Sequence, residues 1–312
     1  MDPLSDVLSL LKPRSSVAGA FDVGGDWAVS FPRHDGIKCY AVLSGQCWLV
    51  MEGIESPVLV RTGECFLLPR GRPFRMETRP GLTPLSYEVF ASITRAGGIA
   101  TVGGGGDFMM AGSHFLLGGE QASVLLGVLP PIVHIGGEAD RAAMRWSMDR
   151  MRQELSDPQP GGHLVIQHLA QLMLVQALRL HLAEGAKGGV GWLFALADRQ
   201  MGAAIGAMHA EPACRWTLQA LAERAGMSRS TFALRFKETV GSSPMDYLTR
   251  WRMLLAGDRL ETTAEPVSAI ALSLGYESES AFSTAFKRVM GCSPRQYGRR
   301  QAPVTAEAAL AA

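Results

Sequence analysis

Hydrophobic and polar residues follow different patterns along the chain, and each pattern predicts a different kind of structure. Between residues 20 and 95, apolar runs such as WAVSF and QCWLVMEG are separated by glycine and proline about every ten residues, which predicts an antiparallel β-barrel or sandwich. From Glu138 the apolar spacing becomes helical, and SDPQPGG separates helices expected over residues 139–155 and 163–182. Residues 192–300 are predicted to be helical throughout.

These changes divide the chain into four predicted parts. They are a β domain at 1–135, a helical linker and dimerisation segment at 136–190, a helical module at 191–300 and a flexible tail at 301–312. The helix expected at 163–182 is apolar over much of its circumference, so it must be buried in a core or against a second subunit, which favours a homodimer. Polar residues such as Gln167, His168 and Arg179 interrupt it, so no membrane span is expected.

One 17-residue stretch occurs twice. SRSTFALRFKETVGSSP (228–244) and SESAFSTAFKRVMGCSP (278–294) share eight identical positions at a constant offset of 50. In the first copy we expect Ser228 to be the N-cap of a helix that stops at Gly241, and the second copy matches it. At about 100° per residue, the two phenylalanines of each copy share one face of the helix, and small polar residues occupy the opposite face.

The segment before each copy completes a helix–turn–helix unit. LQALAERAG and VSAIALSLG predict short bracing helices, the second entered through Pro266. Major grooves recur along B-DNA about every 34 Å, and the helix expected at 244–261 would span about 27 Å. Two such units therefore predict double-stranded DNA as the partner. A plain helical domain is the alternative, but it leaves the repeat unexplained.

Charge is distributed unevenly along the chain. Residues 191–300 hold 14 lysines and arginines against 10 acidic residues, whereas the remainder holds 16 against 19. This asymmetry favours a polyanionic partner for the C-terminal module. Contacts to DNA phosphates are expected from Arg229, Lys237, Arg250, Arg252, Lys287 and Arg288.

The five cysteines are dispersed and form no CxxC motif, and no basic-then-apolar run opens the chain. An odd, scattered set of cysteines without a secretion signal is typical of reduced thiols in the cytoplasm. A redox sensor is the alternative, because a thiol in electropositive surroundings would be reactive.

Residues 270–297, IALSLGYESESAFSTAFKRVMGCSPRQY, resemble the signature of the AraC/XylS family of bacterial transcription regulators. The resemblance implies sequence-specific DNA binding, with RNA polymerase as a possible further partner. It places base contacts on Ser230, Ala233 and Leu234 in the first copy and on Glu279, Ser280, Ser283 and Thr284 in the second. Many relatives carry arginine where this chain has Leu234 and Thr284, so thymine-methyl contacts and DNA-shape readout become more plausible here.

The N-terminal region resembles the cupin sensor domains found ahead of AraC-type modules. YAVLSGQCWLVMEG (40–53) and GECFLLPRGRPF (63–74) fit the two cupin motifs, but Tyr40, Val42, Gln46 and Phe74 occupy the four metal-ligand positions. Those side chains are unsuited to a divalent metal, so neither a metal nor another cofactor is expected. A small-molecule effector could instead bind in the barrel mouth. Its candidate lining residues are Tyr40, Gln46, Trp48, Phe74 and Arg75.

The sequence therefore predicts an α+β multidomain protein with a cupin-like antiparallel β-barrel, a helical linker and an all-α module with two helix–turn–helix units. The favoured hypothesis is a cytoplasmic, homodimeric, non-enzymatic transcription regulator that is modulated by a small molecule or a partner. One alternative is a ligand-independent dimeric regulator with a filled barrel. Another is a cupin-type enzyme with an accessory DNA module.

Overall fold

The computed structural model describes residues 2–11, 14–88, 99–116, 129–184 and 190–300. Its contacts divide the chain into two compact units. The barrel unit is Leu11–Glu184, and the helical unit combines Met1–Leu10 with Gly185–Ala312. The first ten residues therefore group with the helical unit, although the sequence analysis included them in the β domain predicted at 1–135.

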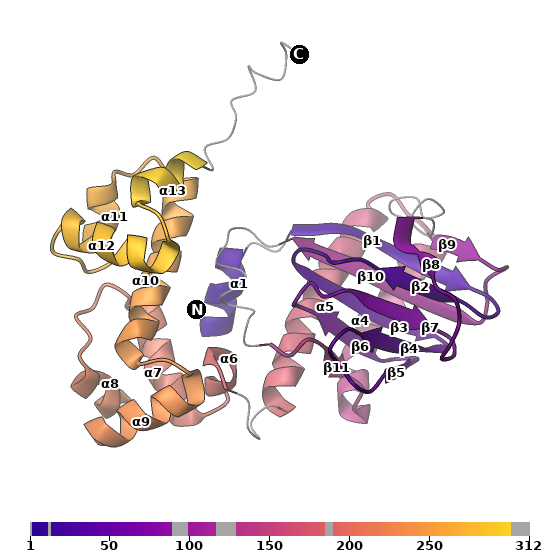
Figure 1. Ribbon diagram of the computed structural model, residues 1–312, viewed down its shortest axis with the longest axis horizontal. Helices are drawn as coiled ribbons and strands as arrows, with labels where there is room; N and C mark the ends of the chain where they lie inside the picture. The colour runs from indigo at the N-terminus through magenta and orange to yellow at the C-terminus, as the bar shows by residue number, and fades with distance from the viewer. Residues whose placement is uncertain (1, 12–13, 89–98, 117–128, 185–189, 301–312) are drawn as a thin grey trace, which may run out of the picture. The chain divides into compact units, whose positions relative to one another are not determined.

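The barrel unit contains two antiparallel-rich sheets (Figure 1). One sheet, here called sheet A, has the strand order β11-β6-β3-β10-β1-β9, and sheet B has the order β5-β4-β7-β2-β8. The strands of sheet A are β1 (Arg14–Val23), β3 (Ile37–Ser44), β6 (Cys65–Leu68), β9 (Ile99–Val102), β10 (Phe108–Leu116) and β11 (Val133–Ile135). Those of sheet B are β2 (Ala28–Phe31), β4 (Gln46–Met51), β5 (Val58–Arg61), β7 (Phe74–Glu77) and β8 (Leu85–Ser86). The β fold predicted for the N-terminal region is confirmed.

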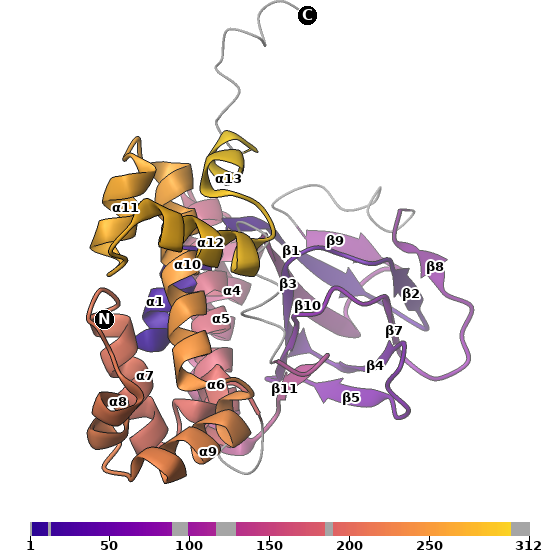
Figure 2. The same cartoon turned by 60° about the vertical axis from the view of Figure 1, so that its left-hand side comes forward.

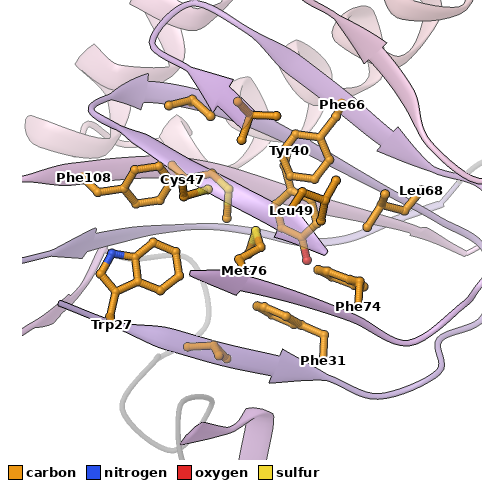
Figure 3. Packing of buried hydrophobic residues seen from close by; sticks show 14 of the residues in the cluster. Trp27, Phe31, Tyr40, Cys47, Leu49, Phe66, Leu68, Phe74, Met76 and Phe108 are labelled. Atoms are coloured by element: carbon orange, nitrogen blue, oxygen red, sulfur yellow. The ribbon is translucent and has the colours of Figure 1, made fainter. Parts of the chain in front are cut away.

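Burial along the strands explains their sequence patterns. In β3 almost every residue is buried, because this inner strand of sheet A meets the core on one face and packed helix on the other. Its sequence is therefore a nearly continuous apolar run. In β4 exposed or half-buried residues alternate with buried ones, as expected where only one face meets the core. The core between the sheets is rich in aromatic rings (Figure 3).

Two helices complete the barrel unit, α4 (Glu138–Ser156) and α5 (Gly162–Glu184). They pack on each other and against strands of sheet A, including β1, β3, β6 and β11 (Figure 2). Both helices fall within a few residues of the predicted ranges. Among the described residues, none of the helices has the length and continuous apolarity that a bilayer crossing requires.

The helical unit is built from short helices around the longer helix α10 (Figure 1). Its elements are α1 (Pro3–Leu11), α6 (Trp192–Ala195), α7 (Arg199–Ala210), α8 (Leu218–Arg224), α9 (Arg229–Val240), α10 (Pro244–Thr262), α11 (Val267–Ser273), α12 (Glu279–Met290) and α13 (Pro294–Arg300). Helices α9 and α12 lie near opposite ends of α10 in both views (Figures 1 and 2). Residues 185–189 of the predicted linker segment and the tail predicted at 301–312 lie outside the described residues.

Candidate DNA-binding surface

Each copy of the repeated stretch folds as the second helix of a helix–turn–helix unit, α8–α9 and then α11–α12. The Ser228 hydroxyl accepts a hydrogen bond from the Thr231 amide at 3.2 Å, and the Ser278 hydroxyl accepts one from the Ala281 amide at 3.2 Å. The helices end at Gly241 and Gly291, whose φ angles of 83° and 76° are left-handed, a conformation that glycine adopts without a Cβ clash. The predicted start and stop of both helices are confirmed.

The phenylalanines of the repeat form the two hydrophobic cores of the helical unit. Phe232 and Phe236 are fully buried with ring centroids 5.5 Å apart, and Phe282 and Phe286 repeat this at 5.7 Å. A tyrosine packs edge-on against each pair. The Tyr247 ring centre lies 5.8 Å from that of Phe236, and the Tyr297 ring centre lies 5.5 Å from that of Phe286. The inward faces of α9 and α12 are thus equivalent, and their orientation is fixed by apolar packing.

The predicted base-contacting residues lie on the outward faces of the same helices. Ser230, Leu234, Ser280 and Thr284 are exposed, while Ala233, Glu279 and Ser283 are half-buried. Leu234 is notable because 62% of its surface is exposed, although a leucine normally gains by burial. Thr284 donates its hydroxyl proton to the Ser280 carbonyl oxygen at 3.0 Å, which leaves its methyl group and the oxygen lone pairs facing outward. Both faces therefore offer apolar or hydrogen-bond-accepting groups at this position.

Five of the six residues predicted to contact phosphates are exposed cations. They are Arg229, Lys237, Arg250, Lys287 and Arg288. Lys237 and Lys287 occupy equivalent positions in the last turns of α9 and α12. An exposed lysine or arginine at such a place can approach a phosphate without losing an intramolecular partner.

Arg252 corrects the sixth prediction. Its guanidinium donates to the main-chain oxygen of Pro212 at 2.6 Å and to that of Cys214 at 2.8 Å, and it lies 5.7 Å from the centre of the Tyr276 ring. These contacts join α10 to the segment before α8 and to the turn of the second unit. Arg252 therefore stabilises the module instead of offering a free charge to DNA.

Helix α1 belongs to the helical unit, and sequence reasoning missed it. Leu4 and Val7, one helical turn apart, are buried, and Asp6 approaches the Nδ1 atom of His209 at 3.4 Å. The other ring nitrogen of His209 is 2.8 Å from the Tyr247 hydroxyl, and its ring stacks on Trp251 with centroids 3.8 Å apart. The apolar spacing at residues 4 and 7 was the available signal for this helix.

Burial determines the protonation of this cluster. It lowers the pKa of His209 to about 3 and raises the pKa of Asp6 above its usual range. His209 is therefore neutral at pH 7, and its approach to Asp6 is a contact between a carboxylate and an uncharged imidazole. The cluster gains its stability from packing and from the bond to Tyr247.

The five residues predicted to line a ligand site do not share one face of the barrel. Tyr40 and Phe74 are buried in the core between the sheets. Gln46 and Trp48 alternate with the core-facing residues of β4, and Arg75 forms an ion pair with Glu77 on its own strand at 3.1 Å. Of the four cupin ligand positions, Tyr40, Val42 and Phe74 pack in the core. Within the described ranges, His, Cys, Asp and Glu side chains form no group of three that could hold a metal ion.

Comparison with known proteins gives matches to both units. A cupin family model matches residues 2–183, and a helix-turn-helix domain model matches residues 221–300. An AraC-like transcription regulator of Streptomyces lividans is 42% identical over 298 residues, covering 95% of this chain and 98% of that protein. Another from Streptomyces antibioticus is 41% identical over 305 residues, covering 97% and 100%.

Among solved structures, the DNA-binding domain of AdpA in complex with a target DNA is 29% identical to this chain. That comparison covers 36% of this chain and 93% of the AdpA chain, with a TM-score of 0.28.

Proposed function

This chain belongs to the AraC-like transcription regulators with a cupin domain ahead of the helix-turn-helix domain, and we propose that it reads two successive major grooves of one operator. The observation that carries the proposal is the structural repeat. Both copies bury an equivalent phenylalanine pair and turn an equivalent face outward. A helical bundle needs no such duplication, whereas a duplex presents the same groove once per turn.

The connecting helix α10 supports the groove assignment. It has 19 residues, and at about 1.5 Å per residue it is about 28 Å long. The groove period is about 34 Å. Since α9 and α12 lie near opposite ends of α10, the separation of the two reading helices is of the order that adjacent grooves require.

The test is binding of the full chain to a randomised duplex library, followed by anisotropy titration of an enriched sequence over a range of salt concentrations. The proposal expects an enriched motif with two conserved blocks and an affinity that falls steeply with salt. A double variant, Lys237→Glu with Lys287→Glu, should lose binding to every sequence. Absence of any enriched motif, or affinity independent of salt, would contradict the proposal.

A homodimer through α5 is the second part of the proposal. Leu164, Val165 and Leu172 are exposed on this helix, with 59%, 36% and 40% of their surfaces accessible. Val165 and Leu172 are seven residues apart, so they fall on one stripe that includes Leu164 at its edge. A second copy of the chain offers the same stripe, and packing the two stripes against each other would bury the apolar side chains of both copies. Sedimentation of the wild type should give a dimer, and Leu172→Glu should give a folded monomer. A wild type that sediments as a monomer would contradict this part.

Regulation through the barrel is the third part. We infer that a small molecule or partner bound by the barrel unit changes the population of DNA-binding-competent arrangements. The competing candidate is a ligand-independent regulator, and one observation favours it, namely the dense aromatic packing between the sheets (Figure 3). The proposal assigns no catalytic role to the chain. Because its target is the chromosome, we infer action in the cytoplasm, and contact with RNA polymerase stays a prediction.

A further inference from the structure

One lysine lies inside the barrel, where apolar side chains are expected. Lys38 is on β3 with the same parity as Tyr40 and Val42, which face the core. Only 8% of its surface is exposed. Its ammonium nitrogen lies 5.1 Å from the centre of the Phe31 ring, 5.2 Å from that of Phe74 and 5.2 Å from that of Tyr87.

The ammonium lies within the distance at which aromatic rings attract a cation, and it sits beside the Phe31–Phe74 stack rather than over both of its faces. Phe31 and Phe74 are themselves stacked with centroids 4.5 Å apart and almost parallel planes (Figure 3). Tyr87 is half-buried and its ring lies 5.3 Å from that of Phe31. The amine is therefore held in an aromatic cage at one end of the barrel core.

No anion accompanies this charge in the part of the chain that the structure describes, where neither a hydrogen bond nor an ion pair reaches the Lys38 amine. A buried charge without a counter-ion is costly because it loses its hydration and gains no equivalent partner. Burial lowers the pKa of Lys38 to about 8, so the ammonium form still predominates at pH 7. Cation–π contacts offset only part of the lost hydration, and the site would gain from an added anion.

A second polar atom near the cage also lacks a partner. The Nε2 atom of His34 is buried without a hydrogen bond within the described residues, and the His34 ring meets the edge of Phe74 with centroids 6.1 Å apart. The Lys38 charge contributes, after burial, to lowering the pKa of His34 to about 4, so His34 is a neutral group close to the ammonium. Two unsatisfied polar groups and three aromatic rings thus gather at one place.

We propose that Lys38 is the anchor for the carboxylate of a small effector whose apolar body packs on Phe31, Phe74 and Tyr87. The carboxylate would pair with the ammonium, and the apolar body would find the aromatic surface that small-molecule sites usually provide. This inference deepens the proposed regulation through the barrel and rests on it. Tyr40 and Phe74, two of the residues predicted from sequence, line the same region of the core.

The experiment measures the melting temperature and binding heat of the full chain with linear carboxylates from butyrate to decanoate. Alcohols of the same chain length are the neutral controls. The proposal expects one or more carboxylates to raise the melting temperature and to bind at least tenfold more tightly than the matching alcohol. Equal binding of carboxylate and alcohol, or no stabilisation by any member of the series, would overturn it.

Two variants assign the effect to the amine. Lys38→Met keeps the length of the side chain and removes the charge, so it should raise the melting temperature of the free protein and lose carboxylate binding at least tenfold. Lys38→Arg keeps the charge and should retain more of the binding. Undiminished carboxylate binding by Lys38→Met would overturn the proposal. The same preparations are titrated with operator DNA, so a failure of DNA binding is recognised separately from a failure of the carboxylate site.

Discussion

The two helix–turn–helix units have the same interior and different exteriors. Phe232 and Phe236 match Phe282 and Phe286 in burial and in ring geometry. On the outward faces, Arg229 at the first position of α9 is replaced by Glu279 in α12, and Leu234 is replaced by Thr284. The phenylalanines that fix the fold are therefore identical in both copies, whereas the outward faces keep the serine at 230 and 280 and differ at other positions.

The supports of the two units differ as well. In the first, Arg235 bonds to Gln200 at 2.9 Å and pairs with Asp198, which joins α9 to α7, but its counterpart in the second is Ala285. In the second, Glu279 pairs with Arg295 at 3.4 Å, and Met245 occupies the position equivalent to Arg295 in the first. Each unit therefore holds its reading helix by its own polar contacts around a common apolar core.

The largest effect is expected from the shared interior. Phe236→Ala and Phe286→Ala each leave a cavity in a fully packed core, which typically costs about 3–5 kcal/mol of unfolding free energy. Denaturant unfolding of the full chain should show similar losses for both variants. Lys237→Ala and Lys287→Ala, on the exposed faces, are the matched controls and should change stability little. A large difference between the two phenylalanine variants would break the equivalence of the interiors.

The pH dependence of stability should differ between the helices that precede the two units. His209 of α7 titrates in the acid range, whereas its counterpart in α10 is Arg259. The pKa of His209 is about 3, below the ~6.5 of an unfolded histidine, so the unfolded chain binds the proton more readily. The stability is complete above about pH 6.5 and falls toward pH 3 by at most ~1.4 kcal/mol per pH unit.

Urea unfolding between pH 7 and pH 4 tests this expectation. His209→Phe should flatten the loss of stability relative to the wild type, while His168→Gln, at an exposed position of α5, should leave it unchanged. Since His34 in the barrel unit also has a pKa lowered to about 4 by burial, the difference between variants is the informative quantity. Identical pH profiles for wild type and His209→Phe would exclude the assigned role of His209.

Charge reversal on the flanks should weaken DNA binding about tenfold or more in either unit. Lys237→Glu and Lys287→Glu each remove one phosphate contact and add repulsion, and each should reduce the slope of log affinity against log salt by about one. Because phosphates carry no sequence information, the preferred motif should not change. Salt titrations of the two variants that kept the wild-type slope would show that these lysines do not contact the backbone.

The smallest effects should distinguish the two exteriors. Leu234→Ala and Thr284→Ala remove methyl groups that the proposal assigns to base edges, with an expected cost of about 1 kcal/mol at a thymine. Glu279→Gln should relax a preference for cytosine, because a carboxylate can accept a hydrogen bond from the cytosine amino group. Library selection with each variant should alter one block of the motif and leave the other intact. A variant that left both blocks unchanged would remove its residue from the reading surface.

Local sequence patterns predicted most of the helical unit. Serine N-caps, glycine stops and the spacing of the phenylalanines are decided within one or two turns of helix, so Ser228 and Gly241 could be placed in advance. The role of Arg252 could not, because its acceptors Pro212 and Cys214 are about 40 residues away along the chain. The burial of Lys38 could not be predicted for a similar reason. Only the register of β3 within its sheet shows that this lysine faces the core.

The most direct test of the central claim is affinity as a function of the spacing between the two blocks of an enriched operator. If α9 and α12 read successive grooves from one face of the duplex, affinity should be highest at a spacing of about one helical turn, 10–10.5 base pairs. Insertion of about half a turn should reduce affinity to that of a single block. Equal affinity at every spacing would contradict the account.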